Sequence, residues 1–238
     1  MTDVVTAAGK VLATGFGAVA RLTSAKPMHP RGVLCSARLE RFGRERPLGV
    51  PWLDEAGTDD AVLRLSRSLG LPTVLPDILG FALRVPGERP VDLLLSSTGS
   101  GRYTRLVFLP RHDAARTYGS VMAYSSPRGP IRFAAWATRP SLPSGTEQLA
   151  AVAERGDVSF SLATAVGGAD WEPFARVRVT GLWAPADPPL HFDAVRHAPP
   201  GLRADGPIAR LRRPAYAAAR DALDDELVDG APAGSPRG

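Results

Sequence analysis

The sequence predicts one α+β domain in which antiparallel strands form the core and helices lie near both ends of the chain. Short apolar runs at 79–85 and 91–96 flank Gly87 and Pro90, and apolar runs separated by turn residues are typical of paired antiparallel strands. Residues 4–22 place apolar side chains three or four positions apart, which is the pattern of an amphipathic helix. With 238 residues, 44% of them hydrophobic, the chain can bury one sizeable core.

Composition and charge exclude several classes of protein. The 29 Lys and Arg exceed the 24 Asp and Glu, which gives a net charge of +5 and an isoelectric point near 10.0. Carboxylates spread along the chain balance most of the basic residues, so we expect no nucleic-acid partner. Cys35 is the single cysteine, which excludes an intrachain disulfide and a cysteine-based zinc cluster. Four histidines lie at positions 29, 112, 191 and 197, without the short spacing of a metal-ligand pair.

The two ends of the chain differ from the centre. Residues 1–24 are interpreted as an N-terminal helix or arm. A signal peptide is the alternative interpretation of these residues, but Asp3 lies where a signal peptide is basic and Lys10 interrupts the apolar run. No window reaches the roughly 18 apolar residues of a membrane span, so we expect no span and a cytoplasmic protein. Residues 225–238 are rich in Pro and Gly, which predicts a disordered tail.

Turn residues divide the central part of the chain into further elements. Residues 43–56 are predicted to form a loop that packs Trp52 against the strands. Residues 144–155 form a predicted helix, with Ser144 as its N-cap and Glu147 three positions later. Additional strands are predicted at 33–42, 103–109, 119–124, 131–136, 158–164 and 174–183.

Several short motifs follow one another along the chain. They are Lys26, His29 and Arg31-Gly32; Arg64-Leu65-Ser66; Pro76 to Ala82; Asp92-Leu93 and Ser96-Ser97-Thr98; Phe192-Asp193; Pro199-Pro200-Gly201; and Arg212 with Tyr216. In order and approximate spacing this set resembles the barrel core of the monofunctional heme catalases, from Lys26 to Arg220. The resemblance implies a closed antiparallel β-barrel with flanking N- and C-terminal helices. The barrel and its C-terminal helix would occupy residues 25–224.

The same resemblance implies a heme b cofactor and the residues that hold it. Tyr216 matches the tyrosine whose phenolate is the fifth ligand of the iron in that family, and Arg212 the arginine four residues before it. A phenol with a pKa near 10 ionises at neutral pH only when iron and a cation favour the anion. Lys26 and Arg64 match basic residues at the heme propionates, where a guanidinium suits a carboxylate.

On the other side of the heme, the resemblance implies a set of residues that act on peroxide. His29 matches the histidine that moves a proton between the two peroxide oxygens, and Ser66 the hydroxyl that orients its imidazole. Ser97 stands where the family has an asparagine, and a serine hydroxyl is shorter than an amide and rotates, so we expect slower dismutation. Asp77 has two open interpretations, a residue of the peroxide channel or a turn residue after Pro76.

The function implied is that of a catalase-related heme peroxidase. It would reduce hydrogen peroxide or organic hydroperoxides, with a small-molecule peroxide and an unidentified reductant as its partners. The sequence leaves open whether the chain forms a homo-oligomer. A hydrolase function that uses a serine near Ser97 is not supported, because the sequence has no GxSxG motif there. The Ser/Gly cluster at 96–101 also lacks the pattern of a phosphate-binding P-loop.

An alternative is a barrel that has lost heme and binds another apolar ligand or a protein. Ser97 replaces the asparagine, and the family's heme-stacking phenylalanine has no clean counterpart, because Phe108 comes too late unless the chain has a local insertion. Pro214 is best tolerated in the first turn of a helix, which would leave Arg212 before that helix. Tyr216 would then pack a C-terminal helix against the barrel.

Overall fold

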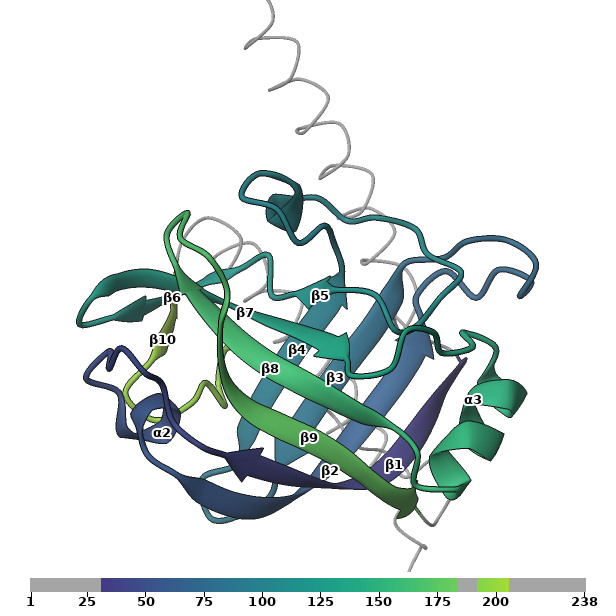
Figure 1. Ribbon diagram of the computed structural model, residues 1–238, viewed down its shortest axis with the longest axis horizontal. Coiled ribbons are helices and arrows are strands. Elements are labelled where there is room, and N and C mark those ends of the chain that lie inside the picture. The colour runs from purple at the N-terminus through teal and green to yellow at the C-terminus, as the bar shows by residue number, and fades with distance from the viewer. Residues whose placement is uncertain (1–30, 184–191, 206–238) are drawn as a thin grey trace, which may run out of the picture.

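Eight antiparallel strands close into a barrel in the computed structural model, which describes residues 31–183 and 192–205 (Figure 1). The strand order is β7-β5-β4-β3-β2-β1-β9-β8, and hydrogen bonds between β7 and β8 close the barrel. The barrel strands are β1 (Arg31–Arg41), β2 (Gly57–Arg67), β3 (Leu79–Val85), β4 (Val91–Ser97), β5 (Tyr118–Gly119), β7 (Gly129–Ala137), β8 (Ser159–Val166) and β9 (Glu172–Leu182). The sequence-based prediction of a closed antiparallel barrel is confirmed.

Shorter elements extend or cover the barrel. Beyond β7 the sheet continues through β6 (Ala123–Ser126) to β10 (Arg203–Asp205). The α-helices are α2 (Pro51–Asp54) and α3 (Thr146–Glu154), and Thr104–Leu106 form the 3-10 helix η1. Figure 1 shows α3 beside the N-terminal half of β1.

The barrel interior holds the hydrophobic core. Side chains alternate between the two faces of each strand, so Leu63 and Leu65 of β2 belong to the core whereas Arg64 between them faces outward. At the centre, the ring of Phe81 lies 5.1 Å from Phe160 and 5.7 Å from Tyr118. Burial of these rings and of the surrounding Leu and Val side chains is the main force that holds the barrel together.

The predicted strand at 103–109 is wrong. The segment forms η1 instead, because the turn begun at the Ser/Gly cluster continues: Arg105 N donates to Gly101 O at 3.0 Å and Gly101 N to Thr104 Oγ1 at 3.1 Å. Gly99 is required here, since a Cβ on it would lie 2.3 Å from the Cβ of Thr104. The apolar run therefore contributes only a single bridge, between Thr98 and Phe108.

Three other expectations need correction. The strand predicted at 119–124 is two strands, β5 and β6, because Val121 adopts a φ of 50° that interrupts the pairing. The loop at 43–56 contains the short helix α2, with Pro51 in its first turn. Ser144 is not the cap of α3, because the N-cap residue is Gly145, which has no side chain to accept a hydrogen bond. Ser144 Oγ instead accepts a 2.9 Å hydrogen bond from Arg67 Nη1.

Packing of Trp52 against the barrel is confirmed. Its ring lies 5.7 Å from that of Phe174 on β9 and is 9% exposed. The cation of Arg41 lies 5.5 Å from the centre of the same ring. The loop that carries Trp52 is therefore attached to the barrel by both an aromatic and a cationic contact.

Several predicted features lie outside the described residues. These are the N-terminal helix or arm at 1–24, the C-terminal helix, the tail at 225–238, and the site residues Lys26, His29, Arg212 and Tyr216. None of the helices in the described part of the chain is long and apolar enough to cross a membrane.

Candidate functional site

The outer face of β1 to β4 carries a row of small residues. The strand registers place Gly32, Ser66, Gly80 and Ser96 opposite one another across the four strands. Neighbouring strands lie about 4.8 Å apart, so the row forms a strip roughly 14 Å wide with no side chain larger than serine.

Arg64 lies beside this strip. It faces the same side as Ser66, two residues further along β2, and is half-buried. A Cβ built on Gly32 would lie 3.1 Å from Arg64 Cζ and 3.0 Å from the carbonyl oxygen of Leu65, so the guanidinium runs across Gly32. The absence of a side chain at position 32 thus lets the guanidinium of Arg64 lie close to the sheet.

The register separates the two serines that end β4. Ser96 lies opposite Gly80 on the outer face, together with Ser66. Ser97, the residue selected from the sequence, belongs to the opposite face and is 1% exposed. Its hydroxyl accepts a hydrogen bond from Leu79 N at 3.0 Å and donates one to Leu109 O at 2.7 Å. Ser97 therefore joins three chain segments, and Ser96 is the serine that shares a face with Ser66 and Arg64.

Phe108 returns to the same outer face. The segment 99–107 folds away from the barrel, and the chain then pairs Phe108 with Thr98. Opposite residues of an antiparallel pair share a face, and Thr98 follows Ser96 by two residues, so Phe108 is next to the end of the strip. The fold of segment 99–107 therefore returns Phe108 to the outer face, beside the candidate site.

Asp77 organises the connection between β2 and β3. Its carboxylate is fully buried and accepts hydrogen bonds from Leu69 N at 2.9 Å and Leu71 N at 3.2 Å. Arg67 Nε lies 3.6 Å from Asp77 Oδ2. Of the two interpretations left open, the structure supports the turn residue.

Asp92 is the centre of a buried network that sequence reasoning did not detect. Arg84 binds its two oxygens with Nε at 2.7 Å and Nη2 at 2.6 Å, and His197 Nδ1 lies 2.9 Å from Oδ2. The backbone N of Asp193 donates to the same oxygen at 2.7 Å. Asp92 and Arg84 face outward, in line with Leu94 and Ala82, so this network attaches residues 192–197 to the edge of the candidate face.

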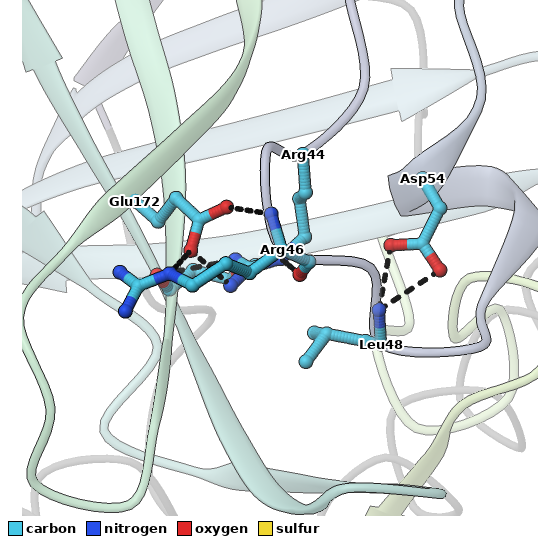
Figure 2. A network of polar contacts seen from close by, with 6 residues as sticks. Arg44, Arg46, Leu48, Asp54 and Glu172 are labelled. Atoms are coloured by element: carbon cyan, nitrogen blue, oxygen red, sulfur yellow. Dashed lines mark hydrogen bonds and ion pairs between the residues drawn. The ribbon is translucent and has the colours of Figure 1, made fainter.

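A second buried network joins the start of β9 to the connection after β1 (Figure 2). Glu172 accepts hydrogen bonds from Arg44 Nη2 at 2.7 Å and from the backbone N of Arg46 at 2.9 Å. Arg44 also donates to the hydroxyl of Thr164. Burial lowers the pKa of the Arg44 guanidinium, and the Glu172 carboxylate acts in the opposite direction. All these groups bind one another, so the network has a structural role: it joins the start of β9 to the connection after β1.

Other chemistry finds no support in the described ranges. They contain no group of three His, Cys, Asp or Glu residues that could hold a metal ion. Burial raises the pKa of the Cys35 thiol to about 12, which excludes a thiolate nucleophile at neutral pH.

Comparison with known proteins identifies the fold. No protein-family model matches the sequence, and no curated protein matches it. Catalase A from Saccharomyces cerevisiae matches the structure with a TM-score of 0.58 at 11% sequence identity, over 82% of this chain and 60% of that chain. The barrel is catalase-like. A fungal catalase matches with a TM-score of 0.56 at 13% identity, over 82% of this chain and 58% of that chain.

The likeness to these catalases concerns the fold alone. Identities of 11% and 13% establish a shared arrangement of strands, and the chain spans less than two thirds of the length of either catalase. The catalase-like barrel places the strip of Gly32, Ser66, Gly80 and Ser96 on its outer face, with Arg64 beside it. Arg64 and Ser66, selected from the sequence, share this face. Ser96 was not selected, and Phe108 was considered but set aside as too late in the sequence. The alternation of β4, in which Leu93 and Leu95 are core residues, is the signal that places Ser96 outward.

Proposed function

We propose that this chain is a catalase-related heme protein that reduces hydrogen peroxide or an organic hydroperoxide. The observation that carries the proposal is the strip of small residues bordered by Arg64 and ending at Phe108. A flat, side-chain-poor surface, a half-buried cation and an aromatic ring suit a planar apolar group that bears carboxylates. Heme is such a group, and the motif order along the chain points to it independently.

The described residues fit one face of a heme. Arg64 would hold a propionate by a charge-assisted hydrogen bond, and Gly32 leaves room for its guanidinium. Phe108 would offer a ring for stacking at the end of the strip. The sequence supplies the remaining candidates: Tyr216 as the iron ligand, with Arg212 as its partner, and Lys26 as a second propionate ligand.

When bound, heme would supply the iron at which the peroxide O–O bond is broken. This chain's own residues would position the peroxide and move its proton. His29 would accept the proton from one peroxide oxygen and return it to the other, because an imidazole with a pKa near 6.5 exchanges protons at neutral pH. The Ser66 hydroxyl would fix the imidazole orientation. Ser96 replaces Ser97 in this proposal as the hydroxyl that faces the peroxide.

The test of heme binding is the visible absorption spectrum of the purified full-length protein, with and without added hemin. We expect a Soret band that Tyr216→Phe abolishes, because phenylalanine has no oxygen for the iron. Tyr103→Phe is the matched control, since Tyr103 is 76% exposed and lies in the segment 99–107 that folds away from the barrel, and it should leave the band unchanged. A colourless protein that ignores hemin would overturn the proposal.

A second prediction concerns the serine on the outer face. Ser96→Asn should raise the rate of peroxide dismutation about tenfold, because it places an amide donor where β4 faces the strip. Ser97→Asn should lower the melting temperature without this gain, since Ser97 is buried and both its hydrogen bonds hold backbone segments. Oxygen release by the two purified, hemin-loaded variants measures the difference. Equal rates in wild type and Ser96→Asn would remove Ser96 from the site.

The heme-free alternative keeps one supporting observation. Ser96 and Ser66 present only hydroxyls to the strip, with no amide donor among the four residues of the row. Such a surface would also accept a different flat apolar ligand. Failure of hemin binding, combined with binding of a nonpolar fluorescent dye that Gly80→Leu abolishes, would favour this function.

A further inference from the structure

The connection between β2 and β3 exposes an unusual amount of apolar surface. Four large apolar side chains within seven residues are exposed: Leu69 (47%), Leu71 (36%), Val74 (79%) and Leu75 (47%). The other large apolar side chains exposed in the described ranges are Phe42, Tyr103, Val107 and Leu182. Half of this exposed set thus lies in one connection, and such clustering marks an interaction surface. We call residues 68–76 the apolar loop.

Buried polar groups hold the apolar loop in one conformation. Arg67 Nη2 donates to Leu75 O at 2.8 Å and to Pro72 O at 3.2 Å, while the Asp77 carboxylate accepts from Leu69 N and Leu71 N. Arg67 and Asp77 are 3% and 0% exposed. A loop fixed in this way loses less backbone conformational entropy when its apolar side chains bind a partner.

Four backbone N–H groups of the apolar loop are bound by acceptors of the loop itself or of the residues directly after it. Pro72 and Pro76 have no N–H, Leu75 N donates to Pro72 O at 2.9 Å, and Ser68 N donates to Ile78 O at 2.8 Å. Together with the two N–H groups bound by Asp77, four of the seven N–H groups of residues 68–76 are bound within the protein. Each N–H group bound in this way lowers the cost of placing the loop at the apolar boundary of a bilayer, where unpaired polar groups are costly.

No charge within the apolar loop opposes its insertion, and one exposed arginine lies in the adjacent connection. Residues 68–76 contain no charged side chain, and Asp77 is buried. The adjacent connection is tied to the loop by hydrogen bonds between Asp77 N and Arg111 O at 3.1 Å and between Arg111 N and Asp77 O at 2.8 Å. It carries Arg116, whose side chain is 60% exposed with Nε 3.5 Å from Asp113. The whole chain has a net charge of +5.

We propose that the apolar loop inserts into the interface of an anionic lipid bilayer, so that the protein binds a membrane surface without crossing it. Lipid is favoured over a protein partner, because a stable protein interface uses about 20–30 residues a side and the loop has nine. A bilayer needs no complementary shape, and basic residues near an inserted apolar segment strengthen binding to anionic lipids. The loop projects beyond the ends of β2 and β3, where it can reach a flat surface (Figure 1).

Co-sedimentation of the full-length protein with vesicles tests this inference, and it needs no heme. Vesicles of phosphatidylcholine mixed equally with phosphatidylglycerol should bind the wild type, and salt should weaken binding. The double variant Val74→Ser with Leu75→Ser should bind at least about tenfold more weakly, because it removes apolar area from the insertion. The matched control Phe42→Ser with Leu182→Ser changes side chains that are 58% and 41% exposed elsewhere, and it should bind like the wild type.

A second readout locates the contact. Val74→Trp should gain a blue-shifted fluorescence component on addition of the mixed vesicles, whereas Phe42→Trp should not. Absence of wild-type sedimentation with the mixed vesicles overturns the proposal, as does an equal loss of binding in the control variant. A dimer in solution that the Val74 and Leu75 substitutions dissociate, without vesicle binding, would assign the loop to a second copy of the chain and overturn it too.

Discussion

Replacing Asp92 by alanine is expected to lower the free energy of unfolding by about 3–5 kcal/mol. The carboxylate has no exposed surface and accepts four hydrogen bonds, two from Arg84, one from His197 and one from the backbone of Asp193. Its removal leaves the guanidinium of Arg84, whose side chain is 15% exposed, without this carboxylate. It also releases residues 192–197, which the network attaches to β4. Urea denaturation of the two proteins measures the difference.

The chain offers a matched control for Asp92. Asp60 pairs with Arg38 at 3.1 Å, but their side chains are 82% and 53% exposed, so Asp60→Ala should change stability by no more than about 0.5 kcal/mol. Limited proteolysis adds a local readout, since Asp92→Ala should open cleavage sites within 192–205 before global unfolding. If Asp92→Ala were as mild as Asp60→Ala, the network would not hold that segment.

Glu172→Ala is expected to have the second largest effect, a loss of about 3 kcal/mol. The substitution leaves Arg44 buried, with 4% of its side chain exposed, and removes the acceptor of the Arg46 backbone N–H (Figure 2). An uncompensated buried charge is costly, which is why loss of one partner destabilises more than loss of both. Thermal unfolding followed by circular dichroism measures the loss.

A double substitution and a surface control test this explanation. Glu172→Met combined with Arg44→Met should recover most of the stability lost in Glu172→Ala, because it removes the stranded charge. Glu40→Ala should be close to neutral, since Glu40 lies 4.0 Å from Arg178 and both side chains are well exposed. A double variant no more stable than Glu172→Ala would mean that the cost arises from packing and not from charge.

Local patterns in the sequence were sufficient for the strands and for the order of motifs. The apolar runs that became β3 and β4 and the strands at 131–136, 158–164 and 174–183 lie where predicted, because alternation and turn residues act over a few positions. The same local reasoning failed at 103–109, where hydrogen bonds of the Gly101 to Arg105 turn outweighed strand propensity.

The candidate site depended on contacts that no local pattern records. Ser97 was selected over Ser96 because motif alignment does not give the register, and a shift of one residue exchanges the two faces of a strand. Phe108 reaches the outer face only through the fold of segment 99–107. Asp92 and His197 are 105 positions apart in sequence. The sequence by itself determined most of the antiparallel strands, with 103–109 and 119–124 as the exceptions, and its resemblance to the catalases implied their closure into a barrel. Only the tertiary structure decided which side chains meet, because register and ion pairs between distant segments depend on how the strands pair.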